Sequence, residues 1–429
     1  MTQAPTITPE TTPPGSPTVV TVVDRKAPVI LSVLTLGMAL VLLFAARTGD
    51  TTFRFGTRRD FFELPSLTVP ATATAWVFVA VMAVLTAWSW VLFSRRRPTP
   101  MWLVILFAVA AMTAFLTWAA TGATMPVVGL FGGAVALAVP LVFGAMSGVI
   151  GERSGVVNIA IDGQLLAGAF AAALVGSMTG SVWAGLVAAG VAGLLVALLL
   201  GVFAITYLVD QIIVGVVLNV LVIGLTSFLF SQVLAPNAGS LNSPPRFQSF
   251  DIPLLGDIPL IGPVLFRQTL IVYLMYVVVA VIAWALYRSR WGLRLRSVGE
   301  HPKAADTVGI NVLRTRYRAI LLAGAIAGAG GAFYTLVSVP QFNREMTGGA
   351  GYIALAAVIF GKWDPIRATL AALLFGFAST LQGVLSVIGS PVPSQFMLML
   401  PYLVTIFAVA GLVGRSRAPA ADGKAYVKA

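Results

Sequence analysis

Long apolar runs, separated by short polar breaks, make up most of this chain. A membrane-spanning α-helix needs about 20 consecutive apolar residues, so each run of that length predicts one crossing. The pattern therefore predicts an all-α polytopic membrane protein with roughly ten to twelve transmembrane helices, including two short or broken segments. The predicted runs are Pro28–Ala46, Pro70–Phe93, Trp102–Gly122, Val127–Ile150, Val156–Ser177, Val182–Tyr207, Gln211–Val233, Gln268–Tyr287, Ala319–Val339, the short Gly351–Gly361, Pro365–Ile388 and Gln395–Val413.

Composition supports this class. The 429 residues are 58% hydrophobic and 10% charged, and the mean hydropathy is +0.94. Soluble domains carry about 25% charged residues, so this chain falls well outside their range. The chain has no cysteine, which excludes disulfides, thiolate metal sites and a cysteine nucleophile, and its single histidine, His301, excludes a multi-histidine metal site.

The net charge of +12 is a topology signal. The basic residues gather in a few loops without interleaved aromatic residues, which argues against a nucleic-acid partner. If both termini are cytoplasmic, most lysines and arginines fall on the inner side, as the positive-inside rule requires. We therefore expect a multi-pass protein of the cell membrane, surrounded by lipid, with both termini in the cytoplasm. The loop at 47–69 is the weak point, because its four arginines fall outside.

The chain divides into four segments. Residues 1–27 are rich in Thr and Pro and predict a disordered cytoplasmic tail. Residues 28–126 hold the N-terminal spans, residues 127–413 the main body, and residues 414–429 a second cytoplasmic tail. A long, nearly neutral segment at 234–267 is rich in Pro, Gly and Asn and predicts an outer lid or docking surface, or simply a tolerated long loop.

The stretch ERSGVVNIAIDGQLLAGAF begins at Glu152 and interrupts two apolar runs with polar residues and glycines. Backbone leaves helical form inside hydrocarbon only where protein or a watery cavity satisfies its polar groups, so this stretch predicts a broken helix. A second interruption, QFNREMTGGAGYIALAAVIFGKWDP, lies at 341–365. Paired interruptions of this kind point to the solute path of a transporter. The candidate path residues from this pattern are Glu152, Asn158, Asp162, Gln164, Asn219 and Asn343.

A structural alternative stays open for these polar residues. Glu152 with its neighbouring arginine forms a cytoplasmic turn in this alternative. Asn158, Gln164 and Asn219 then serve as interhelical hydrogen bonds, each contributing on the order of 0.6 kcal/mol. Small-xxx-small pairs such as Gly324 with Gly328 are assigned to helix packing.

The most charged stretch of the chain is the loop at 288–318, YRSRWGLRLRSVGEHPKAADTVGINVLRTRYRAI with its flanking residues. Pro302 suits the first turn of a helix, and Gly309 suits its end. The sequence therefore predicts a short helix near Lys303–Val308, presented on the cytoplasmic side as a docking knob.

Three motifs resemble one family. The order G-E-x-P-x-A-A-x-x-x-G-I is similar to the coupling loop of ABC importer permeases for branched-chain amino acids, ribose and nucleosides. ERSGVVNIAIDGQ resembles the first signature of the nucleoside and simple-sugar branch, and GYIALAAVIFGKWDP resembles its second. The resemblance covers about 127–413, and Asp162 stands where many relatives have Glu. In the coupling loop the matching residues are Gly299, Glu300, Pro302, Ala304, Ala305, Gly309 and Ile310.

The resemblance implies a function and a set of partners. The chain would be the permease subunit of an ATP-driven ABC importer for nucleosides. It would pair with a second permease, as a heterodimer or a homodimer, and with an extracytoplasmic solute-binding lipoprotein. The seven coupling-loop residues would contact an ABC ATPase subunit. The residues that would lie near the solute path are Asn158, Asp162, Gln164, Asn343 and Tyr352. The chain lacks a G-x-x-x-x-G-K-[ST] motif, so ATP-Mg would be bound by that partner, and this chain would hold no cofactor and perform no enzymatic step.

Other classes fit less well. Simple sugars such as ribose or galactose, and then branched-chain amino acids, are the alternative cargoes. An ion-coupled secondary transporter would keep ionisable residues deep in the bundle, and the apolar runs here hold few. A membrane enzyme would need a nucleophile or a metal site, for which the chain offers little material. A channel would conduct without nucleotide.

Overall fold

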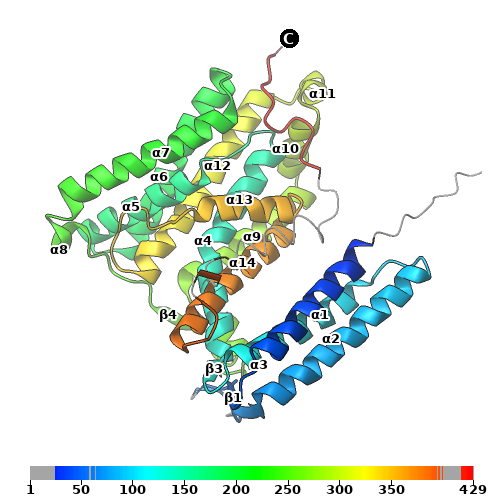
Figure 1. The fold of residues 1–429 in the computed structure, drawn as a ribbon. Coiled ribbons are helices and arrows are strands. Elements are labelled where there is room, and N and C mark those ends of the chain that lie inside the picture. The colour runs from blue at the N-terminus through cyan, green and yellow to red at the C-terminus, as the bar shows by residue number, and fades with distance from the viewer. Residues whose placement is uncertain are drawn as a thin grey trace, which may run out of the picture. The chain divides into compact units, whose positions relative to one another are not determined.

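The computed structural model describes residues 25–57, 59–62, 64–393, 395–396, 399 and 417–428. Most of the predicted N-terminal tail and nearly all of the predicted span Gln395–Val413 therefore lie outside the described residues. Within the described part, ten helices are long and apolar enough to cross a membrane, which confirms the predicted all-α polytopic fold (Figure 1). These helices are α1 (Lys26–Phe44), α2 (Ala71–Ser94), α3 (Met101–Ala119), α4 (Val127–Arg153), α5 (Ile161–Thr179), α6 (Val182–Gly201), α7 (Gln211–Leu229), α9 (Leu270–Arg288), α12 (Val312–Phe333) and α14 (Pro365–Val387).

Shorter elements join these helices. Four π-helical turns extend or connect them: η1 (Val202–Thr206), η2 (Phe230–Leu234), η3 (Gly262–Phe266) and η4 (Tyr334–Ser338). The short helices are α8 (Ala238–Leu241), α10 (Arg290–Glu300), α11 (Pro302–Thr307) and α13 (Ala350–Phe360). The strands are β1 (Asp50–Arg54), β2 (Leu67–Pro70), β3 (Thr124–Pro126), β4 (Ser249–Asp251) and β5 (Arg267–Thr269).

The described chain forms two compact units. The first comprises residues 25–45 and 75–115 and holds α1 with most of α2 and α3. Thr35 of α1 hydrogen bonds Thr86 of α2 through their hydroxyls at 3.0 Å. The Trp90 indole donates to the Ser32 hydroxyl at 2.9 Å. Polar pairs therefore join helices whose other faces are apolar, as is usual in a membrane.

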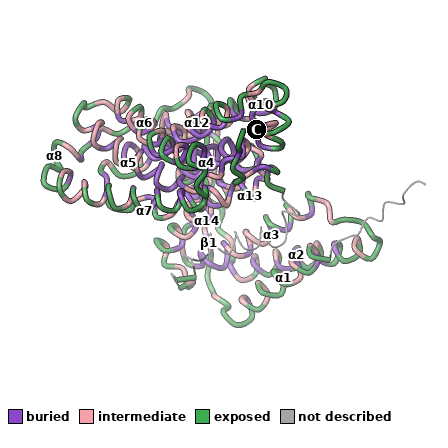
Figure 2. Tube along the Cα trace, turned by 90° about the horizontal axis from the view of Figure 1, so that it is seen from above, coloured by how far each residue is buried: buried purple, intermediate pink, exposed green. Residues whose placement is uncertain are grey.

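The second unit comprises residues 46–74 and 116–428 and holds the predicted body of the protein. Buried residues gather around α4 and α12 at its centre (Figure 2). Its helices approach closely through glycines: a Cβ at Gly168 would collide with the Gly328 carbonyl, and one at Gly193 with the Gly324 carbonyl. The predicted role of Gly324 and Gly328 in helix packing is therefore confirmed.

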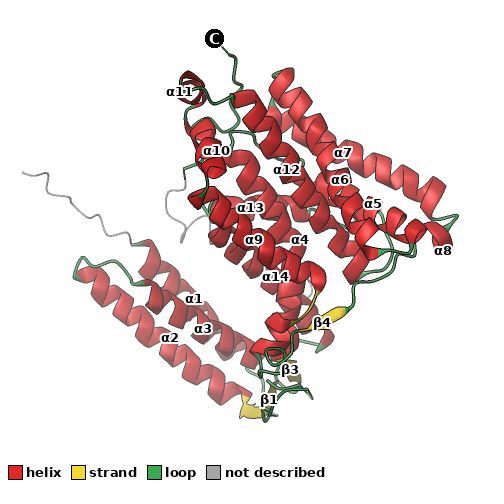
Figure 3. Ribbon diagram, turned by 180° about the vertical axis from the view of Figure 1, so that it is seen from behind, coloured by secondary structure: helices red, strands yellow, loops and turns green. Residues whose placement is uncertain are grey.

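Two small sheets and two short helices lie at opposite ends of the second unit, with β3 and β4 at one end and α10 and α11 at the other (Figure 3). In the larger sheet β1 is central, antiparallel to β2 and parallel to β3. The smaller sheet pairs β4 with β5 in antiparallel register.

Two predicted boundaries are wrong. The span expected at Val156–Ser177 begins as a helix only at Ile161, because side chains from α7 hold the preceding backbone in a non-helical form. The span expected from Ala319 begins earlier, at Val312, where the Asn311 side chain caps the helix by accepting from the Arg314 N–H at 2.9 Å. Basic residues in the first turns of α12 hid this start from hydropathy.

Candidate functional site

The helix α5 begins inside the second unit, beside the middle of α4. A Cβ at Gly144 of α4 would lie 3.0 Å from Cγ2 of Ile161, the first residue of α5. Gly144 lies nine residues before Arg153, the end of α4, which corresponds to about 13 Å along the helix. The chain therefore turns back along α4, and residues 154–160 lead from the end of α4 to the depth of Gly144, as the first interruption predicts.

Side chains of α7 satisfy the backbone of this returning segment. The Val157 N–H donates to Gln211 Oε1 at 2.7 Å, and the Asn219 amide donates to the Ile159 carbonyl at 2.9 Å. Asn219 Oδ1 also accepts from the Gly163 N–H at 2.8 Å. Non-helical backbone is tolerated at this depth because these partners replace the missing helical hydrogen bonds.

Asn158 and Gln164 form a closed pair of amides. Each donates to the other, at 3.0 and 3.1 Å, and Asn158 also donates to the Ser147 hydroxyl at 3.0 Å. All three side chains are fully buried. This geometry is the one that the structural alternative describes, since a polar side chain enclosed by its partners holds helices together.

Asp162 joins the two interruptions. Its carboxylate accepts from the Gly351 N–H at 2.9 Å and from the Thr347 hydroxyl at 3.3 Å. Asp162 is the second residue of α5, and Gly351 is the second residue of α13. Two helix N-termini, each with a partial positive charge, therefore converge on one carboxylate. A Cβ at Gly351 would collide with the Asp162 backbone, which requires glycine at this contact.

Tyr352 lies at the edge of this contact. Its hydroxyl accepts from the Asn219 amide at 3.0 Å, and 47% of the residue is exposed. We call Asp162, Asn219, Thr347, Gly351 and Tyr352 the helix junction. Of its polar side chains, Tyr352 is the exposed one, while the others are buried.

The far end of α13 is fastened to the end of α4. The Trp363 indole donates to the buried Glu152 carboxylate, and the Arg153 guanidinium donates to the Trp363 carbonyl at 3.0 Å. The first interruption thus holds α13 at both ends, through Asp162 at its start and Glu152 beyond its finish.

Asn343 is the predicted path residue that lies apart from the others. It is exposed in the loop between η4 and α13, and within the described residues no hydrogen bond joins it to the helix junction. The neighbouring Phe342 N–H is bound instead to Asn242 Oδ1 at 2.6 Å.

The basic loop contains the predicted short helix. In α11, Pro302 is the first residue, and Gly309 follows the end with φ +83°. The Ile310 N–H donates back to the Ala305 carbonyl at 3.0 Å, which closes the helix. The amphipathic α10 precedes it, so most of the predicted loop is helical.

The seven coupling-loop residues divide by exposure. Gly299 and Ala305 are buried, and a Cβ at Gly299 would collide with the Arg153 carbonyl. Three of the others are exposed and two are half-buried. The exposed residues are Glu300, Ala304 and Gly309, and the half-buried residues are Pro302 and Ile310. A partner therefore has access to one side of this loop, while the other side contacts the rest of the chain.

Sequence reasoning missed several residues that complete these contacts: Ser147, Gln211, Thr347 and Trp363. Trp363 stands inside the second quoted motif, and Gln211 is the first residue of a predicted span. Their position beside the interruptions was a usable signal, but their partners come from distant parts of the chain.

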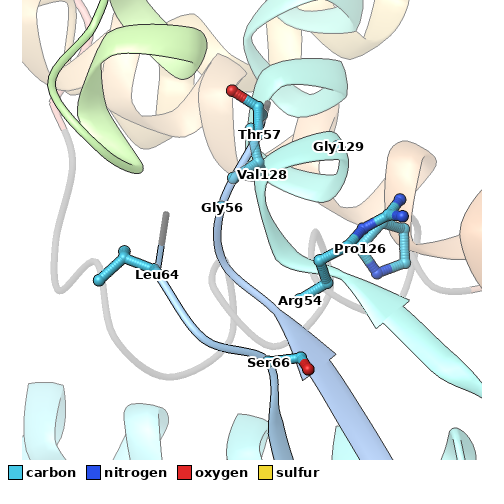
Figure 4. A pocket seen from close by; sticks show the side chains of 8 residues that line it. All are labelled: Arg54, Gly56, Thr57, Leu64, Ser66, Pro126, Val128 and Gly129. Carbon is cyan, nitrogen blue, oxygen red and sulfur yellow. The ribbon is translucent and has the colours of Figure 1, made fainter. Parts of the chain in front are cut away.

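A separate cavity of about 600 Å³ lies at the β-strand end of the second unit (Figure 4). Its lining residues are Arg54, Gly56, Thr57, Leu64, Ser66, Pro126, Val128 and Gly129. The Arg267 guanidinium donates to the Thr57 hydroxyl at 3.0 Å and to Asp257 at 2.9 Å, so it ties this segment to the long loop before α9. None of the predicted path residues lines this cavity.

Half-helices that meet inside an apolar bundle, with a basic helical loop at one end, are typical of a transporter permease. Residues 130–409 match the family described as branched-chain amino acid transport system, permease component, and the chain belongs to this family. The family predicted from the three motifs is thereby confirmed.

Curated relatives agree with this assignment. The guanosine ABC transporter permease protein NupQ of Bacillus subtilis is 41% identical over 304 residues, which cover 68% of this chain and 94% of the relative. The nucleoside ABC transporter permease protein NupC of Lactococcus lactis is 40% identical over 302 residues, covering 67% and 93%. The putative glucose ABC transporter permease protein TsgC13 of Haloferax volcanii is 33% identical over 310 residues, covering 67% and 92%. No solved structure matches this chain.

Proposed function

We propose that this chain is the permease subunit of an ATP-driven ABC importer that carries nucleosides into the cell. The observation that carries the proposal is the helix junction, where two half-helix N-termini meet beside the half-exposed Tyr352. The relatives named for guanosine and nucleosides support nucleosides as the cargo, because this chain aligns with more than nine-tenths of the length of each relative.

The junction suits an uncharged polar solute. An exposed tyrosine ring offers a stacking face for a base, and its hydroxyl offers a hydrogen-bonding group for ribose. The side chains of Asn158, Gln164 and Glu152 are enclosed by protein partners. In this proposal they fix the positions of the helices that form the path and do not contact the solute. Asn219 links the two roles, because it binds both the backbone of the break and the Tyr352 hydroxyl.

The energy comes from a partner in this proposal. ATP-Mg binds an ABC ATPase subunit that docks on the exposed residues of the basic loop, and both termini lie in the cytoplasm, as the loop charges favour. This chain itself performs no enzymatic step. A second permease subunit completes the path.

The opposite end of the second unit suits an extracytoplasmic partner. Outside the spans, Phe61 and Phe62 of the loop before β2 and Phe250 of β4 are 57–60% exposed, and the 600 Å³ cavity lies at the same strand end. Aromatic residues are enriched at protein interfaces. We assign this surface to the solute-binding lipoprotein.

Simple sugars are the second candidate cargo, on the likeness to the putative glucose permease. Uptake of labelled guanosine, uridine, ribose, galactose and leucine distinguishes them. The assay compares cells that lack the gene with cells complemented by wild type or by Tyr352→Ala. We expect nucleoside uptake to be lost, restored by wild type and reduced at least fivefold by the variant, with Tyr207→Ala as an exposed-tyrosine control. Uptake of a sugar alone would change the cargo, and uptake that persists with a collapsed ATP pool would overturn the ATP-driven mechanism.

A further inference from the structure

The C-terminal segment 417–428 packs against the basic loop. Tyr426 is 7% exposed and forms a small apolar cluster with Val298, Ala305 and Val312. Ala305 is the buried residue of α11, so this cluster holds the inner face of that helix.

Backbone groups extend the contact. The Ala421 N–H donates to the Gly299 carbonyl at 2.9 Å, and the Ala420 N–H donates to the Glu300 carboxylate at 3.2 Å. Two of the residues from the coupling-loop motif therefore bind the C-terminal segment directly.

The same segment reaches the first helix interruption on its other side. The Ala421 carbonyl lies 3.1 Å from the Cβ position of Gly155, and the Cβ position of Gly423 lies 3.4 Å from Val157 Cγ2. The Arg316 guanidinium of α12, which is 2% exposed, donates to the Lys424 carbonyl at 2.9 Å. One short segment thus contacts α11, α12 and the link between α4 and α5.

The helix α11 needs such support. It has six residues, and isolated helices much shorter than about 12 residues are marginal in water. A helix of this size transmits the movement of a docked partner only if its orientation relative to the bundle is fixed. Ala305 is the buried residue of this helix, so Ala305 and the residues packed on it provide that fixation.

We infer that residues 417–428 form a clasp that ties α11 to the α4–α5 link and so transmits the movement of the docked ATPase to the helix junction. This inference rests on the proposed function, because it assigns the clasp a part in coupling. Tyr426 is its main positioning residue, since its ring fills the space between α10, α11 and α12.

The first test measures the position of α11 and needs no substrate. The chain has no native cysteine, so spin labels at Lys303→Cys and Tyr207→Cys, both exposed, report the distance from α11 to the bundle without background. We expect a narrow distance distribution in the otherwise wild-type protein and at least a twofold broadening with Tyr426→Ala. Val427→Ala, the 66% exposed neighbour, should leave it narrow. An unchanged distribution in Tyr426→Ala overturns the clasp, whatever the cargo proves to be.

The second test measures coupling in proteoliposomes with the partner ATPase. In Tyr426→Ala we expect solute uptake per ATP hydrolysed to fall at least fivefold while ATPase binding and hydrolysis persist. Loss of ATPase binding would make the segment a docking site and overturn the clasp. A Val157→Cys/Gly423→Cys disulfide should leave uptake intact, because the clasp stays closed through the cycle. Uptake blocked by this disulfide and restored by a reductant would show that the segment must detach, which also contradicts the inference. Absence of uptake by wild type would instead refute the proposed function, and the distance measurement would still decide the clasp.

Discussion

The helix junction and the basic loop are both polar interruptions of an apolar chain, and they use polarity in opposite ways. At the junction, Asp162 and Asn219 are buried, and they accept from backbone N–H groups in the first turns of α13 and α5. In the basic loop, Ala304 and Gly309 are exposed, and Gly299 and Ala305 are buried against the chain. A polar residue inside the bundle therefore hydrogen bonds within the protein, whereas the basic loop leaves one side exposed for a partner protein.

Replacing Asp162 by alanine should have the largest effect on stability. The Gly351 N–H and the Thr347 hydroxyl would lose their acceptor inside the protein. An unsatisfied buried donor costs about 1–3 kcal/mol, so we expect a loss of about 3 kcal/mol. Thermal unfolding of the purified protein in detergent measures it.

A conservative variant and an exposed control sharpen this prediction. Asp162→Asn keeps one acceptor oxygen, so its free energy of unfolding should decrease by about half as much as that of Asp162→Ala. Asp251→Ala, whose contact with Arg59 at 3.5 Å is exposed, should change stability by less than about 1 kcal/mol. Equal melting temperatures for the alanine variants at 162 and 251 would show that the junction is not held by its carboxylate.

Gly351→Ala should have the next largest effect. The added Cβ would collide with the Asp162 backbone, and relieving such overpacking costs about 1–3 kcal/mol. Gly383→Ala is the matched control, because its Cβ would meet nothing within 4 Å on an exposed position of α14. Alanine is favoured over glycine inside a helix by about 1 kcal/mol, so the control should be neutral or stabilising. A change in stability of the same sign for both substitutions would contradict the close contact between α5 and α13.

A smaller effect is expected from pH at the C-terminal segment. Burial raises the pKa of the Asp422 carboxyl to about 7, while the Gly423 N–H and the Arg316 charge oppose the shift. The docked segment therefore binds a proton more tightly than the free one, so docking is strongest at low pH, weakens as pH rises from the ordinary aspartate pKa of 3.8 toward about 7, and levels off above that. Between pH 6 and 8 the docking equilibrium should fall by up to about tenfold.

Thiol labelling checks this direction. Ala421→Cys places the single thiol of the chain at a buried position of the segment, so its labelling reports undocking. The same cysteine in an Asp422→Asn background cancels the intrinsic pH dependence of the thiol. The extra rise in labelling from pH 6 to 8 should disappear in that background, and an identical pH profile would refute a role for Asp422.

The smallest effect on stability is expected for Ala304→Trp. Ala304 is exposed on α11, and surface substitutions change stability by about 0.5 kcal/mol or less. Ala305→Trp should instead destabilise the protein, because that residue is 3% exposed beneath Tyr426. Similar melting temperatures for the two tryptophan variants would contradict the division of the loop into a free and a packed side.

Much of this fold could be predicted from the sequence. Hydropathy gave the spans because apolar runs near 20 residues have few other uses, and the short α11 followed from Pro302 and Gly309. The start of α5 could not be predicted, because it depends on Gln211 and Asn219 of another helix. The hydrogen bonds by which Asp162 and Glu152 hold the two ends of α13 could not be predicted either, since they join residues about 200 positions apart in the chain.

The roles of the site residues were harder to assign than their neighbourhood. The two interruptions do meet, as their pairing suggested, but Asn158 and Gln164 close on each other. Asn343 is expected at the path because it precedes the short apolar stretch of the second interruption, but it lies in an exposed loop. Sequence periodicity does not reveal which polar atoms have hydrogen-bond partners. Only the burial of each side chain in the structure distinguishes a residue that lines the solute path from one that joins helices.

ATP-dependent accumulation of labelled guanosine in proteoliposomes tests the central claim most directly. The vesicles would contain this chain or its Ala304→Trp variant, together with the partner ATPase, permease and solute-binding protein. We expect accumulation by wild type that requires ATP, and at least a tenfold loss in the folded Ala304→Trp protein because its exposed docking side is blocked. Accumulation that proceeds without ATP, or that is equal in both proteins, would contradict it.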